Sequence, residues 1–258
     1  MQRYFLELFF KGTHYSGWQI QKNAVSVQQK LNEAINTLLP ANNNIETTGC
    51  GRTDAGVHAT QFFAHFDSPE IISDSESFIY HLNGILPADI TAVHLHKVAQ
   101  EAHARFDAVK RTYHYYIHSQ KNGFLSEYSA CYFKKPDIAL MQQVSDLLPE
   151  YSDFNSFCKS RAQSRTTLCK IYHAKWKEKN GFLIFEITAD RFLRGMVRAL
   201  VGTMADAGQQ KISVDDFKNI LDAKDRRKAG HAAPACGLYL SKIEYPYLAT
   251  KNHFSFPF

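Results

Sequence analysis

The sequence predicts an α+β protein in which two similar α/β lobes share a mostly antiparallel central sheet flanked by helices. Strand-like and helix-like segments alternate along the chain, and this mixture occurs once before residue 104 and again after it. No Pro-, Gly- or Ser-rich linker marks the boundary near residue 104. A chain of 258 residues is long enough for one large domain or two small ones. We therefore expect lobes at residues 1–103 and 104–258.

The first lobe is expected to open with a strand at residues 3–10. An amphipathic helix should follow at residues 26–40, where Ser26 and Gln29 have the spacing of a capping box and Pro40 would end the helix. Its apolar face is Val27, Leu31, Ala34, Ile35 and Leu38. Short strands at 44–50 and 57–66, a helix at 74–87 and a strand at 90–98 complete this lobe.

The second lobe should contain strands at 108–119, 169–178, 181–190 and 236–246, and helices at 137–148 and from Val214. A long helix is also expected from Arg191. On that helix Arg191, Arg194 and Arg198 would follow one another at i, i+3 and i+7. Stacked like charges repel by a few tenths of a kcal/mol per pair, so either an anion faces them or the face is a solvated basic one.

Composition restricts the location and partners of the protein. The formal net charge of +5 favours an anionic partner only weakly. Five scattered cysteines without a C-x-x-C pair indicate reduced thiols, and the N-terminus lacks the pattern of a signal peptide. No apolar run approaches the roughly 20 residues that cross a membrane. We expect a cytoplasmic protein without a membrane partner.

The segment GCGRTDAGVHA, residues 49–59, is the most unusual stretch of the sequence. Gly49, Gly51 and Gly56 predict a shaped loop, and they surround Arg52 and Asp54. No lysine follows as in a P-loop, and Asp54 takes the place of the third glycine of a dinucleotide fingerprint. Asp54 is either a turn-capping residue or a catalytic nucleophile or base at a cleft. No neighbouring acid offers the second carboxylate of a glycoside hydrolase.

Basic residues with interleaved aromatics raise the possibility of RNA binding. Tyr113, Tyr115 and Tyr116 follow a pair of cations in the strand at 108–119, and stacking with cationic contacts is how proteins hold exposed RNA bases. Alternating tyrosines also suit plain sheet packing. The candidate RNA-binding residues are Arg105, Lys110, Arg111, Arg161, Arg165, Arg191 and Arg194.

Several segments resemble one known family when they are taken together. GCGRTDAGVHA is similar to the signature of the tRNA pseudouridine synthase A (TruA) family, whose G-R-T-D-x-G-V-H core carries the catalytic aspartate. The resemblance continues, in the family's order and over almost the whole chain, through YSGWQ at 15–19, SVQ at 26–28, HARF at 103–106, SRT at 164–166, FLRGMVR at 192–198 and GLYL at 237–240.

The resemblance implies a role for each matching residue. Asp54 corresponds to the catalytic nucleophile and Arg198 to the arginine that pairs with it. Arg52 corresponds to the arginine that displaces the target base, Tyr113 to the aromatic that stacks on the flipped uracil, and Leu238 to an apolar wall of the uracil pocket. The first lobe would carry the aspartate loop. The second would carry the tyrosine, the basic helix and the pocket strand.

The resemblance also implies the pseudouridine synthase fold, with an active-site cleft between the lobes. The substrate would be uridine in the anticodon stem-loop of tRNA, at tRNA positions 38–40, and the protein would work as a homodimer. The chemistry, an isomerisation, needs no cofactor and no metal. Attack at C1′, attack at C6 of uracil and proton removal at C2′ all stay open.

Two other functions remain as alternatives. One is a non-catalytic protein that binds or folds RNA. The other is a metal-dependent hydrolase with Asp54 and His58 as ligands, although a turn can point residues four apart in different directions.

Overall fold

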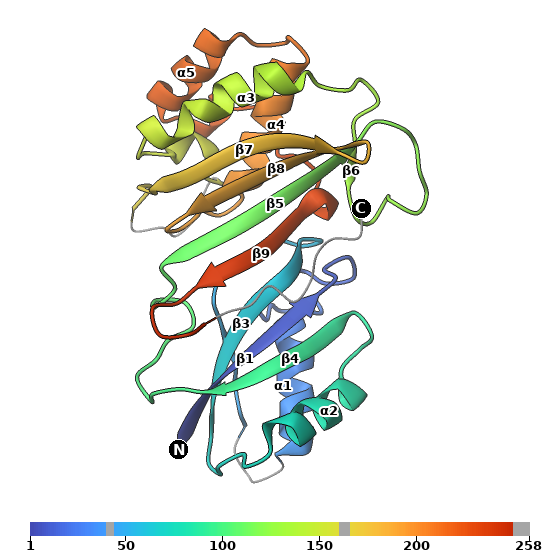
Figure 1. Cartoon of the computed structure of the whole chain (residues 1–258), viewed down its shortest axis with the longest axis vertical. Helices are drawn as coiled ribbons and strands as arrows, with labels where there is room; N and C mark the ends of the chain where they lie inside the picture. The colour runs from blue at the N-terminus through green and yellow to red at the C-terminus, as the bar shows by residue number, and fades with distance from the viewer. Residues whose placement is uncertain (40–43, 160–165, 250–258) are drawn as a thin grey trace. The chain divides into compact units, whose positions relative to one another are not determined.

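The computed structural model describes residues 1–39, 44–159 and 166–249 (Figure 1). The described residues divide into two compact units, a first unit within residues 1–109 and 240–249 and a second unit within residues 110–239. The mostly antiparallel strands and flanking helices confirm the predicted α+β class. Pro40, Arg161 and Arg165, which the sequence singled out, lie outside the described residues.

The first unit is a sheet with the strand order β4-β1-β3-β9, in which β2 also pairs with β3. The pairs of β1 with β3 and with β4 are antiparallel. Figure 1 shows α1 behind these strands and α2 beside β4. The elements are β1 (Gln2–Phe10), α1 (Val27–Leu38), β2 (Thr48–Gly49), β3 (His58–Ser68), α2 (Ser75–Ile85) and β4 (Ile90–Lys97).

The second unit has the strand order β9-β5-β8-β7, with β6 parallel to β5. Leu238 and Tyr239 of β9 (Leu238–Glu244) belong to this unit, and the rest of β9 belongs to the first unit. Figure 1 shows α3 beside β7, and α4 and α5 pack against α3. The elements are β5 (Lys110–His118), β6 (Ala130–Cys131), α3 (Ile138–Asp146), η1 (Leu148–Glu150), η2 (Asn155–Phe157), β7 (Ile171–Lys179), β8 (Phe182–Ala189), α4 (Met196–Gly208), α5 (Val214–Ala223), η3 (Arg226–Lys228) and η4 (Ala235–Gly237).

The core of the first unit explains why β1 and β3 read as nearly continuous apolar runs. In β1 the consecutive residues from Tyr4 to Leu8 are all buried, so both faces of the strand are covered. Trp18 stacks on Phe62 with ring centroids 4.3 Å apart, and Tyr245 packs edge-on against Phe5 at 5.3 Å. The Trp18 ring of the YSGWQ segment is therefore a core residue rather than a substrate contact.

The helix α1 confirms the predicted start at Ser26, whose side chain accepts a hydrogen bond from the backbone N–H of Gln29. The four residues Val27, Leu31, Ala34 and Ile35 form its buried face. The Gln29 side chain does not complete the capping box, because its amide donates to Glu33 at 2.9 Å instead. The cap therefore satisfies one backbone donor of the first turn.

The expected long helix from Arg191 is wrong in its start, because α4 begins at Met196. Gly195 has a φ of +70° and is the N-cap, so the preceding residues are not helical. Arg191 and Arg194 consequently do not share a helical face with Arg198, and the predicted stack of three like charges does not form. Gly202, further along α4, is explained by close packing rather than by its backbone conformation: a Cβ there would lie 1.8 Å from the backbone oxygen of His231.

Candidate active site

The aspartate loop of the first unit, residues 49–57, is held by contacts with the YSGWQ segment. The N–H of Gly56 donates to the backbone oxygen of Tyr15 at 3.3 Å, and Val57 N–H donates to the oxygen of Asp54 at 3.2 Å. Gly56 has a φ of +77°, a conformation that other residues rarely adopt. The turn therefore fixes the backbone on either side of the Asp54 side chain.

Glycines outside the aspartate loop, and Gly49 inside it, allow this close packing. A Cβ on Gly17 would lie 2.2 Å from the backbone oxygen of Thr53, and a Cβ on Gly12 would lie 2.0 Å from that of Val57. Within the loop, a Cβ on Gly49 would meet the Trp18 ring at 2.5 Å, whereas one on Gly51 would meet nothing within 4 Å. Sequence reasoning missed Gly12 and Gly17 because neither lies in a glycine-rich stretch.

Arg52 and Asp54 differ in exposure, although they are two residues apart. The Arg52 side chain is exposed, and its Nε donates to Oε1 of Gln19 at 2.9 Å. Asp54 is half-buried. The loop therefore pairs an accessible guanidinium, held by one amide contact, with a carboxylate that is partly withdrawn from water. Gln19 is a further residue that the sequence motif alone does not assign.

His58 has a structural contact of its own in the first unit. It is 1% exposed at the start of β3, and its Nδ1 accepts a hydrogen bond from the backbone N–H of Gly12 at 3.1 Å. Among the described residues, no group of three or more His, Cys, Asp or Glu side chains is arranged to hold a metal ion. The arrangement gives His58 a role in anchoring the segment that precedes YSGWQ.

Tyr113 lies on β5 of the second unit, where it is paired with Ile187 of β8. Its ring is half-buried and meets Phe192 edge-on, with centroids 5.1 Å apart. Tyr115 is instead fully buried and donates from its hydroxyl to the backbone oxygen of Pro234 at 2.7 Å, and Tyr116 is also buried. Of these three tyrosines, Tyr113 is the one whose ring keeps a partly open surface.

Arg198 lies in the first turn of α4 and is tied to the segment before β9. Its Nε donates to the backbone oxygen of Ala233 at 2.7 Å, and Ala233 N–H donates to the oxygen of Arg198 at 2.9 Å. No acidic residue is present in the first turn of α4. A cation at the positive end of a helix is unfavourable by about 0.3–1 kcal/mol, so this position is not explained by helix stability.

Leu238 begins β9 directly after η4 and is 6% exposed. The chain reaches this position through Gly237, where a Cβ would lie 2.7 Å from the Tyr115 ring. The tight contact fixes the entry of β9 against β5. Leu238 is thus an apolar side chain at a rigid point of the second unit.

Three of the candidate RNA-binding residues, Lys110, Arg111 and Arg191, lie where three strands of the second unit end. Arg111 of β5 and Ile171 of β7 are both paired with Ala189 of β8. Arg111 donates to the backbone oxygen of Asp190 at 2.8 Å, and the Asp190 carboxylate accepts from the N–H groups of Lys170 and Arg191. The acidic charge at this strand-end cluster is therefore already engaged by backbone donors.

Tyr172 and Lys170 extend this cluster beyond the residues that the sequence indicated. The Nζ atoms of Lys110 and Lys170 lie 5.3 and 5.4 Å from the centroid of the Tyr172 ring, which is 44% exposed. Their proximity could not be read from the sequence, because it depends on the register between β5, β8 and β7. Two ammonium groups at one aromatic ring form a site of concentrated positive charge.

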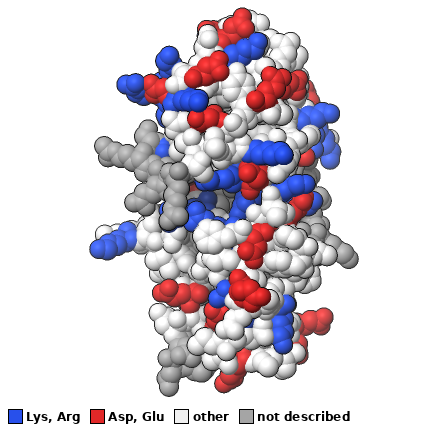
Figure 2. Space-filling model, turned by 90° about the vertical axis from the view of Figure 1, so that its left-hand side faces the viewer, with Lys and Arg blue, Asp and Glu red and all other residues white. Residues whose placement is uncertain are grey.

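Figure 2 shows lysine and arginine side chains interspersed with acidic ones on the face that it draws. The distribution of charge on this face therefore does not by itself mark an anion-binding site.

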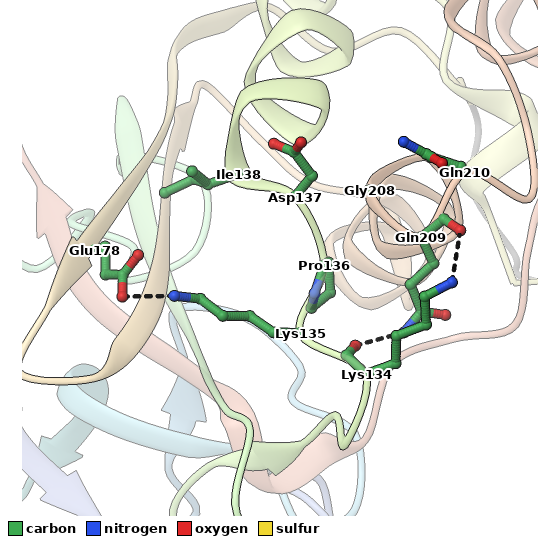
Figure 3. Close-up of a pocket in the computed structure, with 9 residues that line it drawn as sticks. All are labelled: Lys134, Lys135, Pro136, Asp137, Ile138, Glu178, Gly208, Gln209 and Gln210. Carbon is green, nitrogen blue, oxygen red and sulfur yellow. Dashed lines mark hydrogen bonds and ion pairs between the residues drawn. The ribbon is translucent and has the colours of Figure 1, made fainter.

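A cavity of about 420 Å³ lies at the start of α3 (Figure 3). Lys135 at this cavity pairs with Glu178 at 2.7 Å. Lys134 and Gln209 are hydrogen-bonded to each other. No predicted site residue among the described ones lines the cavity, so it is not the candidate active site.

The cysteines and the lengths of the helices are two further features of the described residues. All five cysteines lie in the described part of the chain and are free thiols. Burial raises the pKa of Cys169 to about 12, which makes that thiol a poor nucleophile. Over residues 1–39, 44–159 and 166–249, no helix is both long enough and apolar enough to span a membrane.

Comparison with known proteins identifies the family. The family described as tRNA pseudouridine synthase matches residues 151–246. A tRNA pseudouridine synthase A from Azobacteroides pseudotrichonymphae is 47% identical over 253 residues, which cover 98% of this chain and 100% of the relative. Proteins of the same name from Porphyromonas gingivalis and Clostridium acetobutylicum are 45% and 37% identical over 95% and 93% of this chain and 98% of each relative. The chain therefore belongs to the tRNA pseudouridine synthase A family.

Proposed function

We propose that this protein isomerises uridine to pseudouridine in the anticodon stem-loop of tRNA, with Asp54 as the catalytic nucleophile. The observation that carries the proposal is the loop that presents the half-buried Asp54 two residues after the exposed Arg52, whose guanidinium is held by Gln19. Relatives that match nearly the whole chain are named tRNA pseudouridine synthase A. Both facts favour a nucleic acid substrate over a small molecule.

The reaction determines what the site has to do. The N1–C1′ bond of uridine breaks, the base turns, a C5–C1′ bond forms, C5 loses a proton and N1 gains one. A stacked base hides these atoms, so the nucleotide has to leave the helix. Unstacking costs a few kcal/mol, and a guanidinium that fills the vacancy offsets part of it. Arg52 suits this role because it is exposed and its Nε is oriented by Gln19.

The second unit would supply the binding groups for the extruded base. In this proposal Tyr113 stacks on the uracil, Leu238 forms an apolar wall and Arg198 pairs with the Asp54 carboxylate. The half-open ring of Tyr113 and the position of Arg198 at the positive end of α4 support these roles. The lobes at 1–103 and 104–258 would thus both serve one nucleotide, in a cleft between them.

The tRNA backbone would be held by the basic residues around this site. The strand-end cluster of the second unit supports the assignment, because Lys110 and Lys170 converge on the Tyr172 ring. The RNA-binding candidates are Arg105, Lys110, Arg111, Arg191 and Arg194, with Arg161 and Arg165 outside the described residues.

We extend the proposal to a homodimer that works in the cytoplasm. Sedimentation of the purified protein tests the dimer.

The test is incubation of the purified protein with unmodified tRNA transcripts, followed by mapping of pseudouridine. We expect conversion in the anticodon stem-loop without added metal or cofactor. Asp54→Asn should abolish conversion and leave tRNA binding largely intact. Glu46→Gln, a change at an exposed carboxylate just before the aspartate loop, should convert at the normal rate.

Three outcomes would contradict parts of the proposal. Normal conversion by Asp54→Asn would exclude Asp54 as the nucleophile. Binding of tRNA without conversion by the unaltered protein would favour a non-catalytic RNA-binding protein. Activity that a chelator abolishes would favour the metal-dependent alternative.

A further inference from the structure

Phe106 of the HARF segment is a large aromatic residue that the fold leaves 74% exposed. It lies in a turn, residues 103–107, whose backbone is fixed by its own hydrogen bonds. Asp107 N–H donates to the oxygen of His103 at 3.1 Å, and His103 N–H donates to Oδ2 of Asp107 at 2.8 Å. The Nδ1 atom of His103 accepts from the N–H groups of Arg105 and Phe106 at 3.1 and 3.3 Å.

Buried groups of the first unit anchor this turn. Ala104 is fully buried; its N–H donates to Nδ1 of His65 at 3.2 Å, and its oxygen accepts from the Tyr245 hydroxyl at 2.5 Å. The Tyr247 hydroxyl donates to Oδ2 of Asp107 at 2.6 Å. The turn is therefore attached at three points, so Phe106 is exposed on a rigid support rather than on a loose loop.

The surroundings of the Phe106 ring are polar and cationic. The His103 ring lies against it with centroids 4.2 Å apart and an angle of 37°, and Cζ of Arg105 lies 5.6 Å from the Phe106 centroid. The carboxylate within the turn, Asp107, already accepts from His103 and Tyr247. A protein-binding patch would be contiguous and apolar. An exposed ring beside a guanidinium is instead the combination that holds unpaired nucleobases.

We propose that Phe106 is a stacking platform for an unpaired nucleobase of the tRNA substrate, with Arg105 contacting that base or an adjacent phosphate. This inference rests on the proposed function, and it concerns a base other than the uridine that is isomerised. A preformed platform adds affinity because little conformational freedom is lost when the base binds. The HARF segment thus acquires a role in positioning the substrate.

The test measures tRNA binding by Phe106→Ala, Phe106→Trp and Arg105→Gln. Loss of one base–aromatic stack should weaken binding by roughly 5- to 100-fold in Phe106→Ala, whereas Phe106→Trp should bind normally. The dependence of affinity on salt separates the two residues. Phe106→Ala should keep the slope of log K against log salt, and Arg105→Gln should reduce it by about 0.7–0.9 if the guanidinium neutralises one phosphate.

Phe133→Ala is the matched control, because Phe133 is 75% exposed and lies in the second unit. It should bind tRNA as the unaltered protein does. A scan of transcripts with single abasic positions identifies the partner base. One abasic position should reproduce the loss seen in Phe106→Ala, and combining the two should cause no further loss.

The failure of this inference is distinct from failure of the proposed function. If the unaltered protein makes pseudouridine while Phe106→Ala binds and converts tRNA equally well, the platform is refuted and the proposed function stands. If Phe106→Ala changes the oligomeric state and keeps tRNA affinity, the ring is a protein contact and the platform is again refuted. If the unaltered protein makes no pseudouridine in tRNA, the proposed function fails.

Discussion

Replacing Gly17 with alanine tests whether the YSGWQ segment positions the aspartate loop. Gly17 has a φ of +91°, and its Cβ would lie 2.2 Å from the backbone oxygen of Thr53. Ordinary contacts begin at 3.4 Å, so the two backbones would have to separate by about 1 Å. A strained φ costs about 1–3 kcal/mol and overpacking a further 1–3 kcal/mol. We expect Gly17→Ala to lower the free energy of unfolding by roughly 2–6 kcal/mol.

The catalytic effect should exceed what the lost stability explains. If Asp54 is the nucleophile, a shift of about 1 Å in the neighbouring Thr53 backbone should reduce the rate about 100-fold. The assay is single-turnover conversion of a tRNA transcript, at a temperature where the variant is folded by circular dichroism. Binding of tRNA should change much less than the rate.

Two other glycines provide controls for this experiment. A Cβ on Gly51 meets nothing within 4 Å, so Gly51→Ala should keep the stability to within about 0.5 kcal/mol. A Cβ on Gly12 would lie 2.0 Å from the oxygen of Val57, and no positive φ is involved, so Gly12→Ala should lose about 1–3 kcal/mol. Normal single-turnover conversion by folded Gly17→Ala would refute the idea that this contact positions Asp54.

Two more predictions concern acid stability and salt dependence. Burial lowers the pKa of His65 to about 4, so between pH 6.5 and pH 4 the unfolded chain binds a proton that the folded protein does not. Stability should fall as the pH falls through that range, and His65→Gln should flatten this part of the curve from urea unfolding; an unchanged slope would contradict the assignment. The Lys110→Gln, Lys170→Gln double variant should reduce the salt slope of tRNA binding by about 0.7–0.9 for each lost phosphate contact, whereas Lys218→Gln on α5 should not.

Local signals in the sequence predicted most of the regular elements. The apolar spacing and the N-cap in residues 26–40 predict α1, and the apolar runs of residues 3–10 and 57–66 predict β1 and β3. The strand expected at 44–50 is reduced to the two residues of β2. The two-residue strand β6 carries no such signal, because it exists only through pairing with β5. The sequence also does not predict the start of α4. The apolar periodicity continues through Gly195, and only the positive φ of Gly195 prevents the helix from starting earlier.

The sequence could predict the main residues of the candidate site, but not the neighbouring residues that hold them in place. Asp54 and Arg52 stand out because the motif around them is unusual, and the family resemblance assigns their roles. Lys170 and Tyr172 have no motif of their own, and the YSGWQ segment assigns no role to Gln19. Their placement depends on contacts between residues far apart in the sequence, which neither periodicity nor spacing encodes.

The aspartate loop and the YSGWQ segment behave as one structural element, although residues 20–48 lie between them in the sequence. The contacts that join them include Gly17 against Thr53, Gly49 against Trp18, Gly56 to Tyr15, and Arg52 to Gln19. The Tyr15 hydroxyl is in turn fixed by Asp89, to which it donates at 2.5 Å. A displacement of either segment therefore moves backbone on both sides of Asp54. The precision of the proposed nucleophile thus depends on a small residue at position 17 as much as on the motif that contains the carboxylate.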